Sequence, residues 1–146
     1  MTHRKAINRK EAGFTLLEML IVIGIIALLA ALATPQLLKY FGRAKADTAQ
    51  TQLTYIANAL DFYFLDVGAF PAKAEGLDSL MNRPVSATTW DGPYLKNETG
   101  LIDPWGNAYI YEHNSNGLPV IKSMGADGIP GGDGNNTDLS VSPSTY

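Results

Sequence analysis

The chain has 146 residues, with 14 acidic and 11 basic side chains and no cysteine. Without cysteine there can be no disulfide framework, no thiolate zinc site and no cysteine nucleophile. Residues 1–13 hold four basic residues and one acid, a charge of +3, which leaves seven basic and 13 acidic residues, a charge of −6, in the remainder. Because the acidic remainder lacks the basic face of a nucleic-acid binder, we expect no nucleic-acid partner.

The first predicted element is an uncharged segment of 20 residues, 19–38, which lies between Glu18 and Lys39. As a helix it would be about 30 Å long, the thickness of the hydrocarbon core of a bilayer. The basic leader ahead of it favours a cytoplasmic N-terminus. A carboxylate such as Glu18 is costly in lipid unless it has a partner, so by default it is a functional residue, although it could also be protonated and inert.

Two other interpretations of this segment stay open. It could be an ordinary signal anchor in which Glu18 is incidental. It could also be a removable secretory signal peptide, with Ala31-Leu32-Ala33 as the small-residue cleavage site. Glu18 argues against the second, since a carboxylate does not belong at the head of the apolar region of a signal peptide.

Apolar residues continue at helical spacing after Pro35, at Leu53, Ile56, Ala57, Leu60 and Phe64. We therefore predict one long helix over about 14–65, buried in a membrane in its first half and packed on a domain through its second. Proline removes one backbone donor, so a kink or a loosened turn is expected at that position. Gly68 is expected to end the helix.

The remaining elements are predicted to be short, and they give an α+β chain. In order they are a short helix over 75–81, a turn at 90–93, a short strand at 94–96, a turn at 103–107, and strands at 108–112 and 118–123. An Asn-Gly pair in the loop 113–117 favours a hairpin between the last two strands. After Met124 the sequence is rich in Gly, Asp, Asn, Ser and Pro, which predicts loop.

The turn Asp103-Pro104-Trp105-Gly106-Asn107 is expected to be structural. An aspartate before proline can accept hydrogen bonds within a turn, and proline presets φ. We expect Trp105 to cover the sheet or the helix as part of the core. Gly106 is expected to adopt a backbone conformation that other residues avoid.

The stretch Gly13-Phe14-Thr15-Leu16-Leu17-Glu18 and the apolar run after it resemble the prepilin-type signal of type IV pilins and pseudopilins. The resemblance implies that a prepilin peptidase cuts after Gly13 and methylates the new amino group on Phe14. It also implies that the helix stays on the mature protein, anchors it in the inner membrane and becomes the core of a helical filament. There, the Phe14 amine of one subunit would pair with Glu18 of a neighbour.

Further motifs extend the resemblance to the major pseudopilins of type II secretion systems, the protein G class, over Gly13 to about Asp138. They are Tyr63–Pro71, Glu75–Leu77, Gly92–Leu95, the turn Asp103–Asn107 with Tyr109, and Ser123–Gly128. The segment Ser140–Tyr146 matches no pattern of this family.

This resemblance implies a pilin-like fold, with one long N-terminal helix packed on a small antiparallel sheet. It divides the chain into a leader (1–13), a transmembrane and filament-core helix (14–38) and a periplasmic domain (39–146). The implied protein is not an enzyme. It is the structural subunit of a periplasmic homopolymer that works with minor pseudopilins and an inner-membrane assembly platform to export folded proteins across the outer membrane.

Side-chain oxygens are concentrated near the C-terminus, at Asp127, Asp133, Asn135, Asn136 and Asp138. Such hard donors suit Ca²⁺, although Ile129 rules out an EF-hand, and composition alone favours a solvated loop. The resemblance implies a calcium loop near 124–138, in which Met124 contributes its carbonyl oxygen and Asp127 its carboxylate. It places further ligands near Asn135 and Asn136, where amides instead of the family's usual acids lower the charge of the site.

No catalytic constellation accompanies His3 or His113, since no nucleophile elbow, phosphate loop or metal-binding histidine pair is present. Two alternatives to a pseudopilin remain. One is a type IV pilus or competence-type pilin, against which the missing C-terminal cysteine pair weighs. The other is a secreted soluble calcium-binding domain released by cleavage after Ala33.

Overall fold

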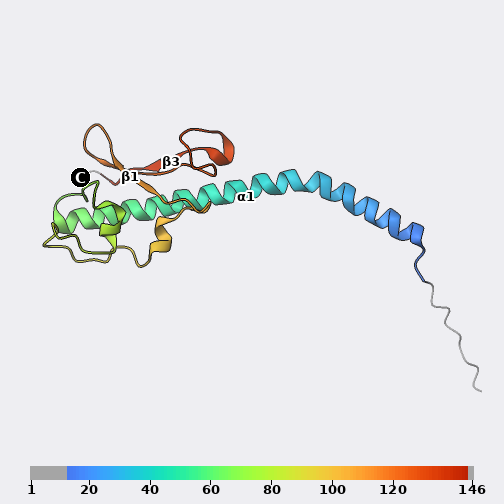
Figure 1. The fold of residues 1–146 in the computed structure, drawn as a ribbon, viewed down its shortest axis with the longest axis horizontal. Helices are drawn as coiled ribbons and strands as arrows, with labels where there is room; N and C mark the ends of the chain where they lie inside the picture. The colour runs from blue at the N-terminus through green and yellow to red at the C-terminus, as the bar shows by residue number, and fades with distance from the viewer. Residues whose placement is uncertain (1–12, 145–146) are drawn as a thin grey trace, which may run out of the picture. The chain divides into compact units, whose positions relative to one another are not determined.

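The computed structural model describes residues 13–144, so of the predicted leader only Gly13 falls within it. The chain divides into two units, residues 1–39 and 40–146, and each is described by itself below. Both contain part of α1, a continuous α-helix over Leu16–Val67 (Figure 1).

Helix α1 has the extent that its sequence predicts, to within two residues at each end. At its start the Thr15 Oγ1 atom accepts a hydrogen bond from the Glu18 N–H at 3.2 Å, as an N-cap side chain does. At its end Gly68 has φ +81° and donates its N–H to the Phe64 carbonyl, which confirms the predicted stop. Pro35 lies inside the helix without ending it.

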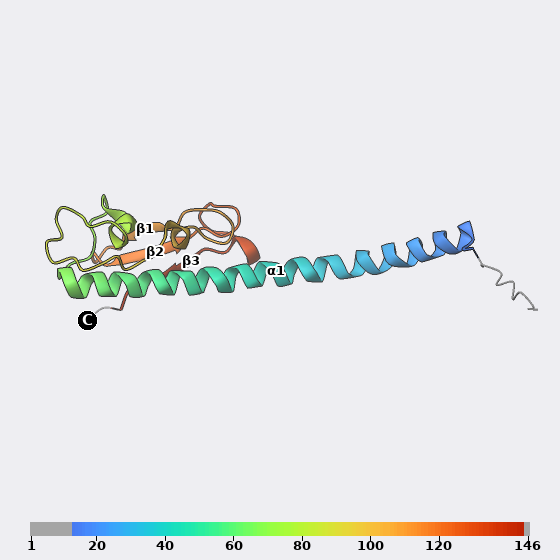
Figure 2. The same ribbon diagram turned by 90° about the horizontal axis from the view of Figure 1, so that it is seen from below.

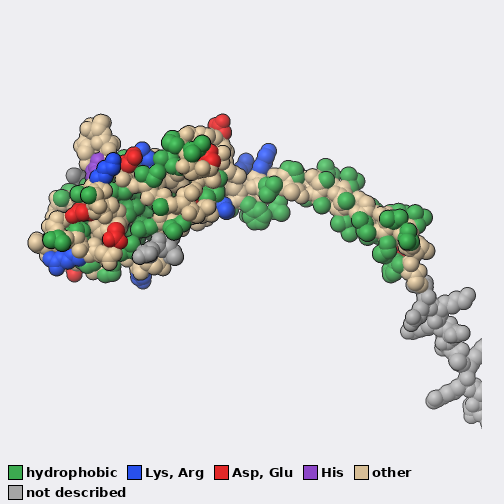
Figure 3. Space-filling model, in the orientation of Figure 1, with side chains coloured by type: hydrophobic (Ala, Val, Ile, Leu, Met, Phe, Trp, Pro, Cys, Tyr) green, Lys and Arg blue, Asp and Glu red, His purple; other side chains and the backbone are tan. Residues whose placement is uncertain are grey.

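In the first unit every residue from Gly13 to Lys39 is exposed, including all of the large apolar side chains. Hydrophobic side chains cover this part of α1 in the space-filling view (Figure 3). By length and composition, α1 could cross a membrane.

In the second unit, α1 lies along the sheet and the connecting loops, which all occupy one side of the helix (Figure 2). The predicted stripe faces them: Leu53, Ile56, Ala57 and Leu60 are buried, and the half-buried Phe64 packs on Phe70. The buried residues that complete this core are Ala59, Tyr63, Leu77, Leu80, Ala87, Tyr109, Tyr111 and Ile121.

The sheet has three antiparallel strands in the order β1 (Ile110–His113), β2 (Pro119–Ser123) and β3 (Leu139–Val141). Strands β1 and β2 form the predicted hairpin, each starting slightly later than expected, with Gly117 at φ +77° in the loop. The C-terminal segment adds a strand that was not predicted, because β3, after the predicted loop, pairs with β2. Three residues are too short a run to show strand periodicity, so this pairing was not visible in the sequence.

Three 3-10 helices connect these elements: η1 (Gly76–Leu80), η2 (Glu98–Leu101) and η3 (Gly134–Asn136). The first confirms the predicted short helix. The predicted strand at 94–96 is wrong, because the N–H groups of Tyr94 and Leu95 both donate to the carbonyl of Leu80, at the end of η1, instead of to a strand.

The placement of Trp105 in the core is also wrong. Trp105 is half-buried and lies outside the core cluster, whereas Trp90 packs against that cluster. The Trp90 indole donates its Nε1–H to the Ser79 carbonyl at 2.9 Å, and its ring meets that of Tyr94 edge to face.

Candidate functional site

The first candidate site is the region around the start of α1, where Phe14 and Glu18 lie. Phe14 precedes the helix and is 75% exposed, and Glu18 is exposed in the first helical turn. A carboxylate in that turn interacts favourably with the positive end of the helix dipole. Thr15 and Glu18 have the spacing of a capping box, in which Thr15 accepts the backbone N–H of Glu18. Glu18 thus helps to start the helix, and its carboxylate remains exposed.

The second candidate site depends on a buried carboxylate, that of Asp103, which is only 4% exposed. Its Oδ1 atom accepts the backbone N–H groups of Trp105 at 3.0 Å and Asn107 at 2.8 Å. Its Oδ2 atom accepts the hydroxyl of the fully buried Ser123 at 2.6 Å. With Gly106 at φ +99°, the turn has the internal hydrogen bonds and the glycine conformation predicted for it.

This turn is hydrogen-bonded to the start of the glycine-rich loop over 124–138. The Asn107 side chain donates Nδ2–H to the carbonyl of Gly125 at 3.2 Å, and the Gly125 N–H points to the Ser123 hydroxyl at 3.4 Å. Sequence reasoning missed both links. The first joins residues 18 positions apart, and the second depends on a serine hydroxyl that is buried only in the folded chain. The polar residue at the end of β2, Ser123, was the available signal.

The loop over 124–138 is closed by contacts between its two halves. The Ala126 N–H donates to the Asn135 carbonyl at 3.0 Å, and the Gly131 N–H donates to the Asp138 carboxylate at 2.9 Å. Gly125, at φ +65°, passes so near the other half that a β-carbon would lie 2.7 Å from the carbonyl carbon of Asn136. The loop is therefore compact through its own backbone.

The residues predicted to bind calcium are all on this loop, and their donor atoms are oxygens, the type that Ca²⁺ prefers. Asp127, Asp133 and Asp138 are exposed, and Met124 and Asn136 are half-buried. Asp127 accepts the Ile129 N–H at 3.3 Å, and the Asn135 side chain lies against Gly42 of α1. Within residues 13–144, no three acidic or histidine side chains converge as a metal cluster. The donor chemistry therefore fits calcium, and the site itself stays a prediction.

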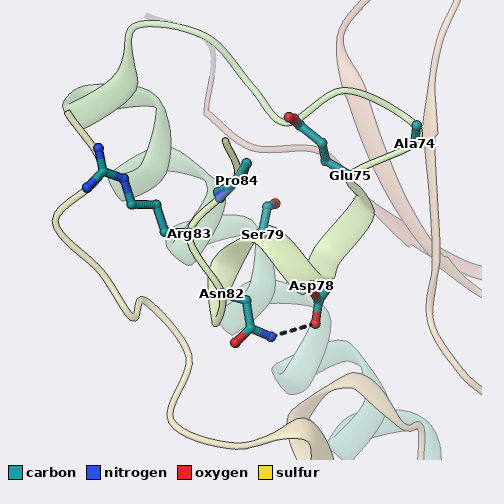
Figure 4. A pocket seen from close by; sticks show the side chains of 7 residues that line it. All are labelled: Ala74, Glu75, Asp78, Ser79, Asn82, Arg83 and Pro84. Atoms are coloured by element: carbon teal, nitrogen blue, oxygen red, sulfur yellow. Dashed lines mark hydrogen bonds between the residues drawn. The ribbon is translucent and has the colours of Figure 1, made fainter. Parts of the chain in front are cut away.

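The cavity beside η1 is a third candidate, with a volume of about 240 Å³ (Figure 4). Its polar groups are already paired: the Asn82 amide donates to Asp78 at 2.9 Å, and Glu75 accepts the Ser86 hydroxyl and the Ala72 N–H. These two hydrogen bonds, that of Ser86 first, hold the pKa of Glu75 below its usual value. Arg83 donates to two carbonyls of the following loop. Hydrogen bonds of this kind stabilise a folded loop. They leave the cavity without a free acid or base.

His113 is the one histidine within the described part of the chain, at the end of β1. Its Nε2 atom lies 3.5 Å from the Tyr111 hydroxyl, which itself donates to the Pro71 carbonyl. This arrangement supports the packing of β1 on the loop after α1, and it pairs the imidazole with no nucleophile.

Comparison with known proteins agrees with this geometry. A family model described as "Type II secretion system (T2SS), protein G" matches residues 36–142, and one described as "Prokaryotic N-terminal methylation motif" matches residues 8–34. The type II secretion system core protein G of Pseudomonas aeruginosa is 39% identical over 138 residues, which cover 90% of this chain and 95% of the relative. The protein of the same name from Vibrio cholerae is 36% identical over 135 residues, 90% of this chain and 91% of the relative.

A solved structure has the same fold. The crystal structure of the major pseudopilin from the type 2 secretion system of enterohaemorrhagic Escherichia coli superimposes with a TM-score of 0.60. The match covers 73% of this chain and 93% of that chain at 24% identity. The pilin-like α+β architecture of one long helix and a small antiparallel sheet is thereby confirmed.

Proposed function

The chain belongs to the type II secretion system protein G family, and from this membership we propose that it is the major structural subunit of a pseudopilus that drives protein export. The observation that carries the proposal is the pairing of an N-terminal methylation motif with a protein G domain in one chain. The type IV or competence-type pilin alternative is not supported, since the curated relatives named above are core proteins of secretion systems.

Processing is the first step of the proposed function. A prepilin peptidase cuts after Gly13 and methylates Phe14, which then begins the mature helix. The methylation motif over residues 8–34 supports this, as does the position of Phe14 just ahead of α1. The retained helix anchors the chain in the inner membrane by a single span, with residues 39–146 in the periplasm.

Assembly is the second step. The apolar side chains of 19–38 are exposed along the whole segment, so they require lipid before assembly and other subunits after it. In an apolar bundle Glu18 needs a positive partner, and the Phe14 amine of a neighbour, freed by cleavage, supplies it. Minor pseudopilins and an inner-membrane platform complete the proposed assembly. The subunit itself is structural, not enzymatic.

Calcium is proposed to brace the loop over 124–138. Asp127, Asp133 and Asp138 with the carbonyl of Met124 would hold it, and Asn135 or Asn136 would add amide or carbonyl oxygens. When bound, the cation would supply fixed positive charge to a segment that has few apolar side chains to bury. The closure of the loop by its own hydrogen bonds supports the proposal, because it brings both halves of the ligand set close together.

The test is complementation of a strain in which the gene has been deleted. The wild-type chain should restore export and form a polymer that sediments from lysed cells, with a mature N-terminus at methylated Phe14 by mass spectrometry. Glu18→Val should be processed normally but form no polymer. The control is Glu112→Gln, which removes one charge from the half-buried pair with Lys122 on the sheet and should behave as wild type. A mature N-terminus at Thr34, or export that is normal with Glu18→Val, would contradict the proposal.

A further inference from the structure

Four residues at the start of the second unit carry exposed aromatic and basic side chains. We call them the belt, and they are Tyr40, Phe41, Arg43 and Lys45. Tyr40 is 69% exposed and Phe41 55%, and their rings meet edge to face with centroids 6.4 Å apart. At 3.6 residues per turn, the belt covers the side of α1 opposite the buried Gly42. The aromatic pair lies in its middle and a base lies at either end.

Neither base of the belt has an acidic partner within the subunit. Among the side chains that the structure describes, the one ion pair joins Lys122 to Glu112. Asp47 follows Arg43 by four residues, a spacing at which a pair can form on a helix, and yet the two are not paired. Two exposed cations are therefore available to an anion from outside the subunit.

Removal of the leader changes the balance of basic residues across the proposed span. The unprocessed chain has four bases before the span and three in the seven residues after it, namely Arg4, Lys5, Arg9 and Lys10 before, and Lys39, Arg43 and Lys45 after. Cleavage after Gly13 removes all four of the first group and none of the second. The positive-inside rule counts Lys and Arg near the ends of a span, so it no longer favours the orientation of the mature chain. The bases on the domain side need another explanation.

We propose that the belt binds the phosphate groups of anionic phospholipid in the leaflet on the domain side of the membrane. This inference rests on the single span of the proposed function, and it names the lipid that the subunit selects. As a helix, segment 19–38 is about 30 Å long, the thickness of the hydrocarbon core. The residues that follow it in the sequence therefore reach the headgroup layer. The belt rises about 8 Å from Tyr40 to Lys45, and that layer is about 5–8 Å thick on each side.

The side chains of the belt have the chemistry of a headgroup site. The planar guanidinium of Arg43 can donate to two oxygens of one phosphate, and the ammonium of Lys45 adds a point charge. A tyrosine such as Tyr40 places its ring in the apolar part of the interface and its hydroxyl in the polar part. Each base near an anionic leaflet contributes about fivefold to binding.

An acidic patch on another protein is a poorer occupant than lipid. An ion pair with such a patch would need the two bases but not the exposed ring of Phe41 between them. The belt also extends around more than half of the helix, from Arg43 through Tyr40 to Lys45. A single protein partner contacts one face of a helix, whereas the headgroup layer surrounds every open side of it.

The test uses the full mature chain in nanodiscs. The chain has no cysteine of its own, so Ala44→Cys, at an exposed position within the belt, places one polarity-sensitive fluorophore there. Replacing about one third of the phosphatidylcholine by phosphatidylglycerol should shift the emission. Salt at about 1 M should reverse the shift, because the Debye length is then about 3 Å. The same fluorophore on Thr54→Cys, about 15 Å further along α1, should not respond.

Two matched double variants assign the response to the belt. Arg43→Gln with Lys45→Gln should lower the preference for phosphatidylglycerol about 25-fold and so abolish the shift. Lys73→Gln with Lys96→Gln removes two exposed bases outside the belt and should retain it. Inorganic phosphate added to nanodiscs of phosphatidylcholine alone should produce no shift, which separates a headgroup from free phosphate.

Three results would overturn the belt as a lipid site. They are equal emission of the wild type in both lipid mixtures, a shift that Arg43→Gln with Lys45→Gln retains, and a shift produced by inorganic phosphate alone. If the wild type shows no lipid response and the same double variant loses the sedimenting polymer, the bases bind an acidic protein partner instead of lipid. Failure of the wild-type chain to enter any nanodisc would overturn the span of the proposed function.

Discussion

The side chain of Asn135 lies directly against the backbone of Gly42, so that helix α1 has no room for a β-carbon at this position. Gly42 is buried, and η3, which contains Asn135, is thereby held close to the helix. A glycine inside a helix costs about 1 kcal/mol relative to alanine. Here the missing β-carbon of Gly42 allows the loop over 124–138 to approach α1.

Gly42→Ala alone is therefore expected to gain less stability than alanine usually brings to a helix, because its methyl group must turn aside the end of the exposed Asn135 side chain. The same substitution in an Asn135→Ala background, which lacks those atoms, should stabilise the chain by about 1 kcal/mol, as measured by urea denaturation in detergent. Equal effects of Gly42→Ala in the two backgrounds would contradict the contact.

Removing the donor to the Asp103 carboxylate should weaken the turn. Ser123→Ala leaves Oδ2 of Asp103 buried without its hydroxyl partner, which costs about 1–3 kcal/mol of stability. Asp103→Ala should cost more, since Trp105, Asn107 and Ser123 all lose an acceptor. The exposed Asp47→Ala is the control and should stay within about 0.5 kcal/mol of wild type. Equal effects of Asp103→Ala and Asp47→Ala would contradict this reading of the turn.

Alkaline pH should destabilise the fold through Tyr94. Burial, and then its hydrogen bond of 2.6 Å to Asp66, raise the pKa of Tyr94 to about 12, from an ordinary value of about 10. The folded state thus holds this proton more tightly than the unfolded state does. The stability that it contributes is fully present below about pH 10 and is lost as the pH rises towards about 12. Burial also raises the pKa of Tyr109 and of Tyr111, which act in the same direction.

The measurement is the melting temperature as a function of pH. Tyr94→Phe should lower the melting temperature at neutral pH, because a hydrogen bond is lost. It should also make the fall of the melting temperature above about pH 10 shallower. Asp66→Asn keeps an acceptor and removes the charge, so an intermediate slope is expected. An unchanged slope in both variants would remove Tyr94 as a source of the alkaline effect.

Calcium should raise the melting temperature if the loop over 124–138 binds it. At a free concentration about 100 times the dissociation constant, a ligand that binds only the folded state adds roughly 2.7 kcal/mol. Chelator should reverse the gain, and magnesium should replace calcium poorly because it requires a smaller octahedral cage. Asp127→Ala should abolish the response while Asp91→Ala keeps it. Identical melting in calcium and in excess chelator would exclude the site.

Features with a local cause could be predicted from the sequence. Helix α1 follows from periodicity that runs through consecutive turns, and its end follows from Gly68. The hairpin follows from the Asn-Gly pair before Leu118. The candidate residues Phe14 and Glu18 likewise depend on neighbours in the chain.

Features with a distant cause could not be predicted. Strand β3 exists because β2 offers it an edge, and the Asp103 carboxylate is satisfied by a serine 20 residues further along. The strand expected at Tyr94 does not form, because the Tyr94 N–H group donates to the carbonyl of Leu80. Sequence periodicity does not reveal this hydrogen bond. Whether the loop oxygens gather around a cation depends on side-chain positions that composition does not fix.

The shortness of the sheet has a consequence for a protein whose task is to polymerise. Both outer strands are brief, with four residues in β1 and three in β3, so neither offers a long row of open backbone groups to another chain. Stacking by strand edges leads to cross-β fibrils, which are too stable to be dismantled easily. The short edges of this sheet therefore disfavour polymerisation by strand addition, and the subunits must join through other surfaces.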